Sequence, residues 1–349
     1  MTMIKTDAVI IGAGPVGLFA VFELGLHGIA CHVVDILDKP GGQCAELYPD
    51  KPIYDIPALP VVSGQALTEG LLKQIEPFQP TFHFGQMVEK LESNGAGGWR
   101  LTTSEGQEFE TKVVVIAAGG GSFQPKKPAI AEIEKFEGKG VAYAVRKIDQ
   151  YNGRRILVAG GGDSALDWVI NLAERAGEIG LVHRRREFRG APSSVKKLET
   201  LVETGRVHFY IGNPVRLVGD GDRLSGVVIE ADGQEQTVAV DCFLPFYGLS
   251  MKLGPLADWN LHLGKGDNDP LDKNLILVDT AEFKTNLDGV YAVGDINYYK
   301  GKLKLILSGF HEVALMAISA KRRLAPSERV TMQYTTSSTK LQRLLKVIE

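Results

Sequence analysis

The sequence predicts an α/β protein made of two similar three-layer units, with one unit inserted into the other. Two observations lead to this prediction. A β-branched strand, a glycine-rich turn, a helix and a second strand occur in that order near residue 12, and the same series occurs again near residue 160. At 349 residues and 44% hydrophobic composition, the chain is also long and apolar enough to bury two such cores.

The first copy runs from a strand at 7–11 through the turn GAGPVG to a helix that we expect to end near residue 27. This is the fingerprint G-x-G-x-x-G between a strand and a helix, which predicts a Rossmann-like dinucleotide-binding domain. The first glycine allows a tight turn, the second lets a pyrophosphate approach the backbone, and the third lets helix and strand pack closely. The N–H groups of the helix N-terminus face the pyrophosphate. The binding candidates in this motif are Gly12, Gly14, Pro15 and Gly17.

The second copy has a strand at 154–160, the turn GGGDSA and a helix that we expect to run to about residue 175. The next strand ends at His183, 23 positions after Gly160, just as Asp35 stands 23 positions after Gly12. The two copies therefore superimpose in sequence and predict a second Rossmann-like domain. Asp163 is interpreted mainly as a helix cap. The binding candidates of this copy are Gly161, Gly162, Asp163, Ser164, His183, Arg184, Arg185 and Arg189.

The two copies carry opposite charge where the second strand ends. A carboxylate such as Asp35 accepts hydrogen bonds from ribose hydroxyls and repels a 2′-phosphate, whereas the arginines of HRRREFR (183–189) bind a phosphate with paired hydrogen bonds. The first site therefore suits FAD and the second suits NADPH. The alternatives are a structural turn with a surface aspartate, and a solvated charged face, to which we assign Arg186.

The flavin domain is expected to be discontinuous. The strand at 112–120 returns the chain past the first nucleotide. In GVYAVGDI (289–296), Asp295 either accepts hydrogen bonds from the flavin ribityl hydroxyls or only caps a helix. Turn-rich segments at 119–128 and 279–289 mark the boundaries. We therefore expect helices on the sheet faces of each domain, with an FAD-binding domain at 1–118 and 288–325, an NADPH-binding domain at 119–287 and a C-terminal extension at 326–349.

Composition excludes several other classes of protein. A net charge of -3 argues against a general nucleic-acid binder. No apolar run reaches the ~18 to 20 residues of a membrane span, and the N-terminus has no signal-peptide pattern, so we expect a cytoplasmic protein. Cys31, Cys44 and Cys242 lie far apart, which argues against a disulfide framework or a zinc site. Cys44 is interpreted as a packing residue.

In order and spacing, GAGPVG, GGGDSA, HRRR with its trailing arginine, and VGDI resemble the motifs of the two-dinucleotide-domain flavoprotein reductases over nearly the whole chain. The pattern looks like thioredoxin reductase, but where that enzyme carries a redox C-x-x-C this chain reads GVAYAVRKIDQ (140–150). Disulfide exchange needs an attacking thiolate and a partner sulfur, so thioredoxin reduction by that route is excluded. The cysteine-free branch that the chain resembles is the thioredoxin-reductase-like ferredoxin–NADP(+) reductases.

The resemblance implies FAD and NADPH/NADP+ as cofactors, a homodimer, and ferredoxin, an acidic iron–sulfur protein, as partner. It also implies that Tyr48 stacks on the isoalloxazine ring and that Gln43 contacts the flavin nucleotide. In the resembling enzymes a C-terminal extension crosses to the partner subunit and covers the other flavin face, and Tyr334 and Thr335 match those positions. Tyr334 is thus a candidate gate for the nicotinamide. The chain departs from the family in its longer end, with a helix expected from Lys340, and in using tyrosine at a variable position.

The predicted reaction is hydride transfer from NADPH to flavin N5, followed by single-electron transfer to ferredoxin, or the reverse. Two alternatives stay open. One is an NADPH-dependent reductase of quinone, flavodoxin or a small disulfide, and the other is a non-catalytic flavoprotein that senses NADPH. Five lysines either form a basic rim that attracts ferredoxin or are plain surface residues: Lys126, Lys127, Lys300, Lys302 and Lys304.

Overall fold

The computed structural model describes residues 3–121, 124–250, 252–265, 273–330 and 334–348. The chain divides into two compact units: unit 1 is Met1–Ser122 with Met251–Glu349, and unit 2 is Phe123–Ser250. Unit 2 is therefore inserted into unit 1, in the order that the sequence predicts.

The chain returns to unit 1 near residue 251, earlier than the predicted boundary at residue 288. The reason is that the intervening residues complete structures of unit 1. Strand β20 (Leu263–Lys265) pairs with β21 (Lys273–Leu277), and β21 pairs in parallel with β23 (Asn297–Tyr298). Trp259 and Leu261 are buried in a core of the same unit. These packing contacts are long-range and leave no local pattern in the sequence.

A five-stranded parallel sheet forms the centre of unit 1. Its spatial order is β22-β10-β2-β3-β6, and every neighbouring pair is parallel. The strands are β2 (Ala8–Ile11), β3 (Cys31–Val34), β6 (Thr81–His83), β10 (Val113–Ile116) and β22 (Val290–Ala292). Because side chains alternate along a strand, Ala8 and Ile10 of β2 enter one core and Val9 enters another.

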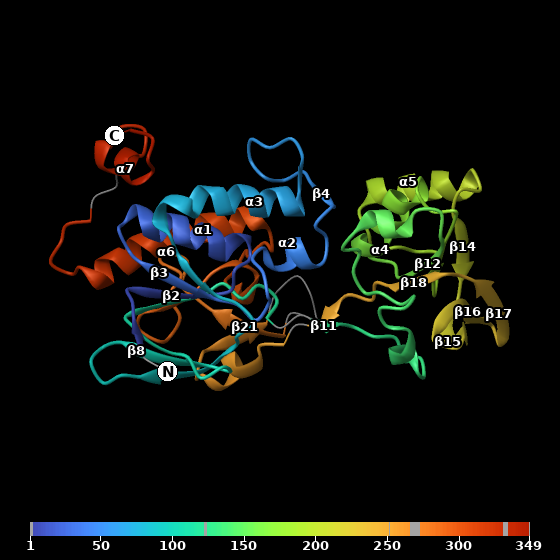
Figure 1. The fold of residues 1–349 in the computed structure, drawn as a ribbon, viewed down its shortest axis with the longest axis horizontal. Helices are drawn as coiled ribbons and strands as arrows, with labels where there is room; N and C mark the ends of the chain where they lie inside the picture. The colour runs from blue at the N-terminus through green and yellow to red at the C-terminus, as the bar shows by residue number, and fades with distance from the viewer. Residues whose placement is uncertain (1–2, 122–123, 251, 266–272, 331–333, 349) are drawn as a thin grey trace. The chain divides into compact units, whose positions relative to one another are not determined.

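Three α-helices cover one face of this sheet. They are α1 (Pro15–Leu26), α3 (Gly64–Ile75) and α6 (Ile306–Leu324), with α1 packed against both of the others. The opposite face is covered by a second sheet of order β1-β9-β8-β7, comprising β1 (Ile4–Lys5), β7 (Val88–Ser93), β8 (Trp99–Thr103) and β9 (Glu108–Thr111). Figure 1 shows α1, α3 and α6 on one side of β2 and β3, and β8 on the other.

Unit 2 repeats this three-layer plan. Its parallel sheet has the order β14-β13-β12-β18, with β12 (Arg155–Ala159), β13 (Glu178–His183), β14 (His208–Ile211) and β18 (Cys242–Pro245). Helix α4 (Asp163–Ala173) packs on this sheet and on α5 (Pro192–Glu203). The other face meets the antiparallel strands β15 (Asn213–Asp220), β16 (Arg223–Ala231) and β17 (Gln234–Ala239). The predicted α/β fold is confirmed, although antiparallel sheets replace helices on one face of each unit.

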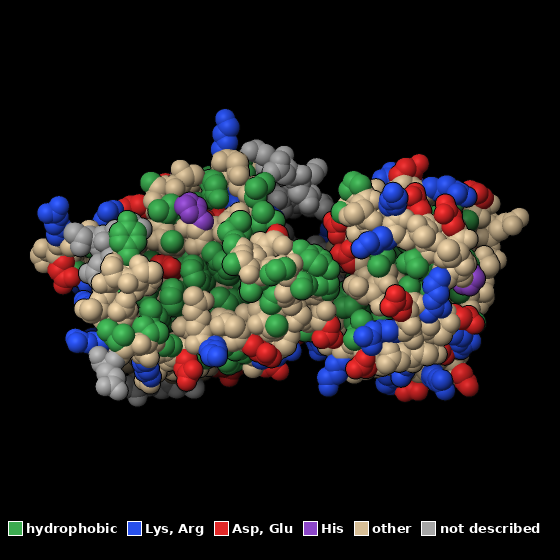
Figure 2. Space-filling model, turned by 90° about the horizontal axis from the view of Figure 1, so that it is seen from above, with side chains coloured by type: hydrophobic (Ala, Val, Ile, Leu, Met, Phe, Trp, Pro, Cys, Tyr) green, Lys and Arg blue, Asp and Glu red, His purple; other side chains and the backbone are tan. Residues whose placement is uncertain are grey.

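Short elements complete the two units. They are α2 (Gly42–Glu46), β4 (Pro52–Ile53), β5 (Val62–Ser63) and α7 (Thr339–Leu344) in unit 1, and β11 (Gln124–Pro125) paired with β19 (Leu249–Ser250) in unit 2. None of the described helices is long and apolar enough to cross a membrane. On the face drawn in Figure 2, apolar side chains gather over unit 1, whereas basic and acidic side chains alternate over unit 2.

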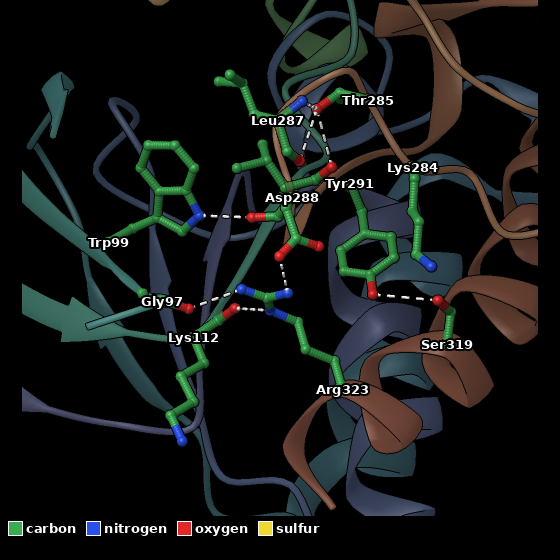
Figure 3. Close-up of polar contacts among 12 residues, drawn as sticks. Gly97, Trp99, Lys112, Lys284, Thr285, Leu287, Asp288, Tyr291, Ser319 and Arg323 are labelled. Carbon is green, nitrogen blue, oxygen red and sulfur yellow. Dashed lines mark hydrogen bonds and ion pairs between the residues drawn. The ribbon is translucent and has the colours of Figure 1, made fainter. Parts of the chain in front are cut away.

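One arginine joins the end of α6 to the five-stranded parallel sheet and to the β1-β9-β8-β7 sheet of unit 1 (Figure 3). The guanidinium of Arg323 donates to the carbonyl oxygens of Lys112 at 2.8 Å and Gly97 at 2.7 Å, and it pairs with the Asp288 carboxylate at 2.5 Å. The indole N–H of Trp99 donates to the backbone oxygen of Asp288 at 2.9 Å. The Arg323 side chain is 18% exposed, whereas the Asp288 side chain is 81% exposed, so the ion pair with Asp288 is open to water and the two hydrogen bonds to backbone oxygens matter more.

Replacing Arg323 by alanine should therefore lower the free energy of unfolding by about 2 to 4 kcal/mol, because hydrogen bonds to charged groups are lost and two carbonyls are left unpaired. Arg322→Ala is the matched control, since the neighbouring Arg322 is 60% exposed and makes one surface ion pair with Glu282. Such a pair contributes less than about 1 kcal/mol. Urea unfolding measures both variants, and equal losses would show that Arg323 has no special role.

Candidate functional site

The first glycine motif forms a tight turn that leaves one glycine open. Gly12 has φ +109°, and a Cβ there would lie 2.4 Å from the Ala117 carbonyl oxygen at the end of β10. A Cβ on Gly17 would lie 1.9 Å from the Gly12 oxygen, so helix and strand pack closely here. Gly14, the N-cap residue before Pro15, has its nearest neighbour atom 3.9 Å from the Cβ position. The backbone therefore offers an open face where α1 begins, which fits a pyrophosphate.

Asp35 is placed as predicted, at the end of β3, and it also braces the turn. Its carboxylate accepts hydrogen bonds from the backbone N–H of Ala13 at 2.5 Å and of Leu37 at 2.8 Å. Burial raises the pKa of Asp35, while these backbone hydrogen bonds act in the opposite direction. The sequence predicted a ligand for ribose hydroxyls, and the structure adds a second role inside the turn.

The segment after β3 brings further predicted residues to this turn. The N–H of Gly41 donates to the Ala13 oxygen at 2.8 Å, and a Cβ on Gly42 would lie 2.9 Å from the Cα of Gly14. The Gln43 amide lies 3.5 Å from the Cβ position of Gly119. Gln43 therefore lies close to the glycine motif, through its neighbour Gly42, and close to Gly119, which follows β10.

Tyr48 and Cys44 are in contact in unit 1 and lie within the electrostatic influence of Asp295. The Cys44 thiol donates to the Tyr48 hydroxyl at 3.7 Å, and the charge of Asp295 acts on both groups. Burial raises the pKa of Cys44 to about 11 and raises the pKa of Tyr48 further above its ordinary value. Cys44 is 1% exposed, in keeping with the predicted packing role. Asp295 lies in a short 3-10 turn, Gly294–Ile296, and α6 begins only at Ile306, so Asp295 does not cap an α-helix.

The second glycine motif has the same division between tight and open positions. A Cβ on Gly160 would lie 2.5 Å from the Phe246 oxygen, and one on Gly161 would lie 2.4 Å from the His183 ring. Gly162 has no atom within 4 Å of its Cβ position, and α4 begins directly after it. This open backbone again fits a pyrophosphate at a helix N-terminus.

The interpretation of Asp163 as a cap is wrong. The N-cap residue is Gly162, and no side chain caps the helix there. The Asp163 carboxylate instead accepts a hydrogen bond from the Ala191 N–H at 2.8 Å, while the Arg189 N–H donates to the Gly161 oxygen at 2.8 Å. The glycine turn and the arginine loop are thereby fastened together, a connection between distant residues that the sequence pattern did not reveal. Ser164 is exposed beside Asp163.

The arginine loop presents its charges to solvent. Arg184, Arg185, Arg186 and Arg189 are all exposed, and the guanidinium of Arg185 lies 3.9 Å from the Glu187 carboxylate. The His183 ring stacks on Phe188 with centroids 5.6 Å apart. Burial lowers the pKa of His183, and the nearby arginines lower it further. A neutral imidazole therefore stands at the base of a strongly positive loop, which suits binding of a phosphate dianion.

The tail does not bring its predicted residues into a site within this chain. Tyr334 is 63% exposed, and Thr335 is exposed as well. The predicted helix is present as α7, capped by the Ser338 hydroxyl, which accepts from the Leu341 N–H at 3.3 Å.

Two lysines of the predicted basic rim are engaged elsewhere. Lys302 is buried and forms an ion pair with Glu312, and the Lys127 ammonium lies 2.6 Å from the Glu137 carboxylate. Glu312 is not among the site residues predicted from the sequence. The one signal for it was helical spacing: Glu312 follows Gly309 by three residues and precedes Met316 by four, which places a charged residue on the buried stripe of α6.

Comparison with known proteins agrees with this architecture. The family model described as pyridine nucleotide-disulphide oxidoreductase matches residues 6–315. Curated relatives named ferredoxin–NADP reductase include proteins of Parvibaculum lavamentivorans (56% identical) and Nitrobacter winogradskyi (57%), each covering 99% of this chain and 98% of the relative. A third relative of that name, from Mesorhizobium japonicum, is 56% identical over 99% of both proteins.

Solved structures share the fold at lower identity. Thioredoxin reductase of T. acidophilum has a TM-score of 0.76 at 21% identity, covering 91% of this chain and 98% of that chain. Thioredoxin reductase of Lactococcus lactis has a TM-score of 0.75 at 23% identity, covering 92% and 100%. The resemblance expected from the glycine motifs and the arginine loop is thus confirmed, and the chain belongs to the pyridine nucleotide-disulphide oxidoreductase family.

Proposed function

We propose that the protein is an FAD-dependent ferredoxin–NADP(+) reductase. One observation carries the proposal: a single chain holds two open glycine turns, one ending in a buried carboxylate and the other in an exposed arginine loop. Two dinucleotide sites of opposite charge suit electron transfer between two cofactors. The curated relatives with that name, 55 to 57% identical over 99% of the chain, support the same activity.

In this proposal unit 1 binds FAD. The open backbone of Gly14 and Pro15 receives the pyrophosphate, Asp35 accepts from a ribose hydroxyl, and Gln43 contacts the nucleotide. Asp295 accepts hydrogen bonds from the ribityl chain, and the Tyr48 ring stacks on the isoalloxazine. The nearness of Tyr48 and Asp295 supports this arrangement, because both must reach the same half of FAD.

Unit 2 binds NADPH in the same proposal. Gly161, Gly162 and the start of α4 at Asp163 and Ser164 hold the pyrophosphate, and the arginine loop with His183 holds the 2′-phosphate. Bound FAD would supply the chemistry that links two-electron hydride transfer from NADPH to single-electron transfer to an iron–sulfur partner. The protein orients the two cofactors and excludes water, and its own side chains form no covalent intermediate.

Cysteine chemistry favours an iron–sulfur partner over a disulfide. Cys31, Cys44 and Cys242 are free and buried, and the segment 140–150 contains no cysteine. Burial raises the pKa of Cys31 to about 12 and that of Cys44 to about 11, so neither is a ready thiolate at neutral pH. A dithiol relay to thioredoxin therefore has no chemical basis in this chain.

Two further properties belong to the proposal. Free, widely spaced cysteines support a cytoplasmic location. The exposed apolar residues of the tail, Tyr334 at 63% and Val347 at 66%, support a homodimer in which Tyr334 and Thr335 cover the partner's flavin.

The activity is tested by mixing the FAD-loaded protein anaerobically with NADPH in a stopped-flow spectrometer, and then by measuring ferredoxin-dependent reduction of cytochrome c. Rapid bleaching of the flavin and turnover that requires ferredoxin are expected. Flavin bleaching followed by turnover only with a quinone would mean that the electron acceptor is not ferredoxin. Bleaching without turnover to any carrier would favour an NADPH sensor.

The arginine loop is tested by the double substitution Arg184→Gln and Arg185→Gln. Each lost charge-assisted hydrogen bond to phosphate removes roughly tenfold in affinity, so KM for NADPH should rise on the order of 100-fold. KM for NADH should change less than about threefold, because NADH has no 2′-phosphate. Arg186→Gln, a neighbouring exposed arginine, is the control and should behave as the wild type. Equal increases for both nucleotides would mean that the loop does not read the 2′-phosphate.

A further inference from the structure

The most strongly buried ion pair among the described residues lies behind the Asp295 turn. Glu312 of α6 is fully buried, and the Lys302 side chain is 3% exposed. The Glu312 carboxylate accepts hydrogen bonds from the Gly294 N–H at 2.7 Å, the Asn297 amide at 2.8 Å and the Tyr299 hydroxyl at 3.1 Å, besides pairing with the Lys302 ammonium. One carboxylate therefore gathers four donors from a single short stretch of chain.

Stability alone does not account for this pair. Two charges lose their hydration on burial, and apolar side chains of similar volume commonly give equal or greater stability. Asn297 supports the same conclusion. Its amide nitrogen donates to Glu312 and to the Ala292 oxygen, while its side-chain oxygen has no hydrogen-bond partner in the described part of the chain. An unsatisfied buried oxygen costs free energy. The Asn297 amide nevertheless keeps this orientation, so we conclude that its two donated hydrogen bonds hold the chain around residue 297 in place.

The position that these hydrogen bonds define is that of the Asp295 turn. Gly294 has φ +79°, and its Cβ position lies 3.4 Å from the Val16 side chain, inside the first glycine motif. A Cβ on Gly309, one turn before Glu312 on α6, would lie 2.4 Å from the same valine. The turn is therefore held between the start of α1 and the buried stripe of α6. The backbone N–H of Gly294, at the start of the turn, donates to the Glu312 carboxylate.

We infer that Glu312 and Lys302 are positioning residues for the flavin: they hold the Gly294–Asp295 turn, and with it the place from which Asp295 would accept from the ribityl chain. The inference rests on the proposed FAD site. Glu312 does not touch the cofactor. Glu312 acts by accepting a hydrogen bond from the Gly294 N–H. As a carboxylate it is a strong acceptor, and the Lys302 ammonium balances its negative charge in the buried interior.

Four variants separate this role from plain core packing. Glu312→Gln keeps an acceptor for Gly294 but leaves the Lys302 charge unpaired, and Lys302→Met leaves the Glu312 charge unpaired. The double variant E312Q/K302M removes both charges and keeps the acceptor. The double variant E312L/K302M removes both charges and the acceptor, so the Gly294 N–H, the Asn297 amide and the Tyr299 hydroxyl lose their partner and the turn is no longer fixed. Glu328→Gln is the control, because Glu328 makes an exposed ion pair with Lys321.

The measurements are the FAD dissociation constant, from fluorescence titration of the apoprotein, and the thermal unfolding midpoint of the same apoprotein. Both single variants should bind FAD at least about tenfold more weakly, and E312Q/K302M should recover to within about threefold of the wild type. E312L/K302M should bind FAD at least about tenfold more weakly, and more weakly than Met316→Ala, a variant of a buried packing residue of α6 that lowers the unfolding midpoint without removing a partner of the turn. The E328Q control should match the wild type.

Wild-type FAD affinity in E312L/K302M would overturn the inference, as would FAD losses that simply follow the loss in thermal stability across the variants. Failure of the proposed FAD site is recognised separately, since the wild-type apoprotein would then not bind FAD at all, and failure of the ferredoxin reaction is recognised by the turnover assay described above.

Discussion

Close approach of backbone to backbone at the carboxyl edge of each parallel sheet is the constraint on which the structure depends. In unit 1 the Gly12 turn lies against Ala117 and the start of α1, with no room for a Cβ at Gly12 or Gly17. In unit 2 the Gly160 turn lies in the same way against Phe246. These contacts leave one open glycine in each turn, Gly14 or Gly162, directly before α1 and α4 begin.

Around the same opening, the two units place opposite charges with different degrees of burial. Asp35 is buried and fastened to its own glycine turn, which fixes the carboxylate proposed to accept from a ribose. The arginine loop is fastened through the backbone at Arg189 and Ala191 and through the Phe188 ring, whereas its arginine side chains are exposed. A buried acceptor suits a cofactor that remains bound, whereas an exposed cationic loop suits a nucleotide that enters and leaves in each turnover.

Sequence reasoning found the features that depend on local pattern. The glycine motifs, the strand ends at Asp35 and His183 and the helix α7 follow from spacing and composition, and the structure places them as expected. It could not find features set by long-range packing. The return to unit 1 depends on the pairing of β21 with β23, the Asp163 carboxylate bonds across 28 positions to Ala191, and Lys302 turns inward only because Glu312 lies on the buried stripe of α6. The roles of Tyr48, Gln43, Tyr334 and Thr335 came from resemblance and stay predictions.

The central claim is that the arginine loop of unit 2 reads a 2′-phosphate on the nucleotide that it binds. Calorimetric titration of the FAD-loaded protein with 2′,5′-ADP and with 5′-AMP tests this directly, because the two ligands differ at the 2′ position alone. We predict that 2′,5′-ADP binds on the order of 100-fold more tightly at low ionic strength, and that the difference shrinks in 1 M salt as the charges are screened. Equal affinities for the two ligands would contradict the account.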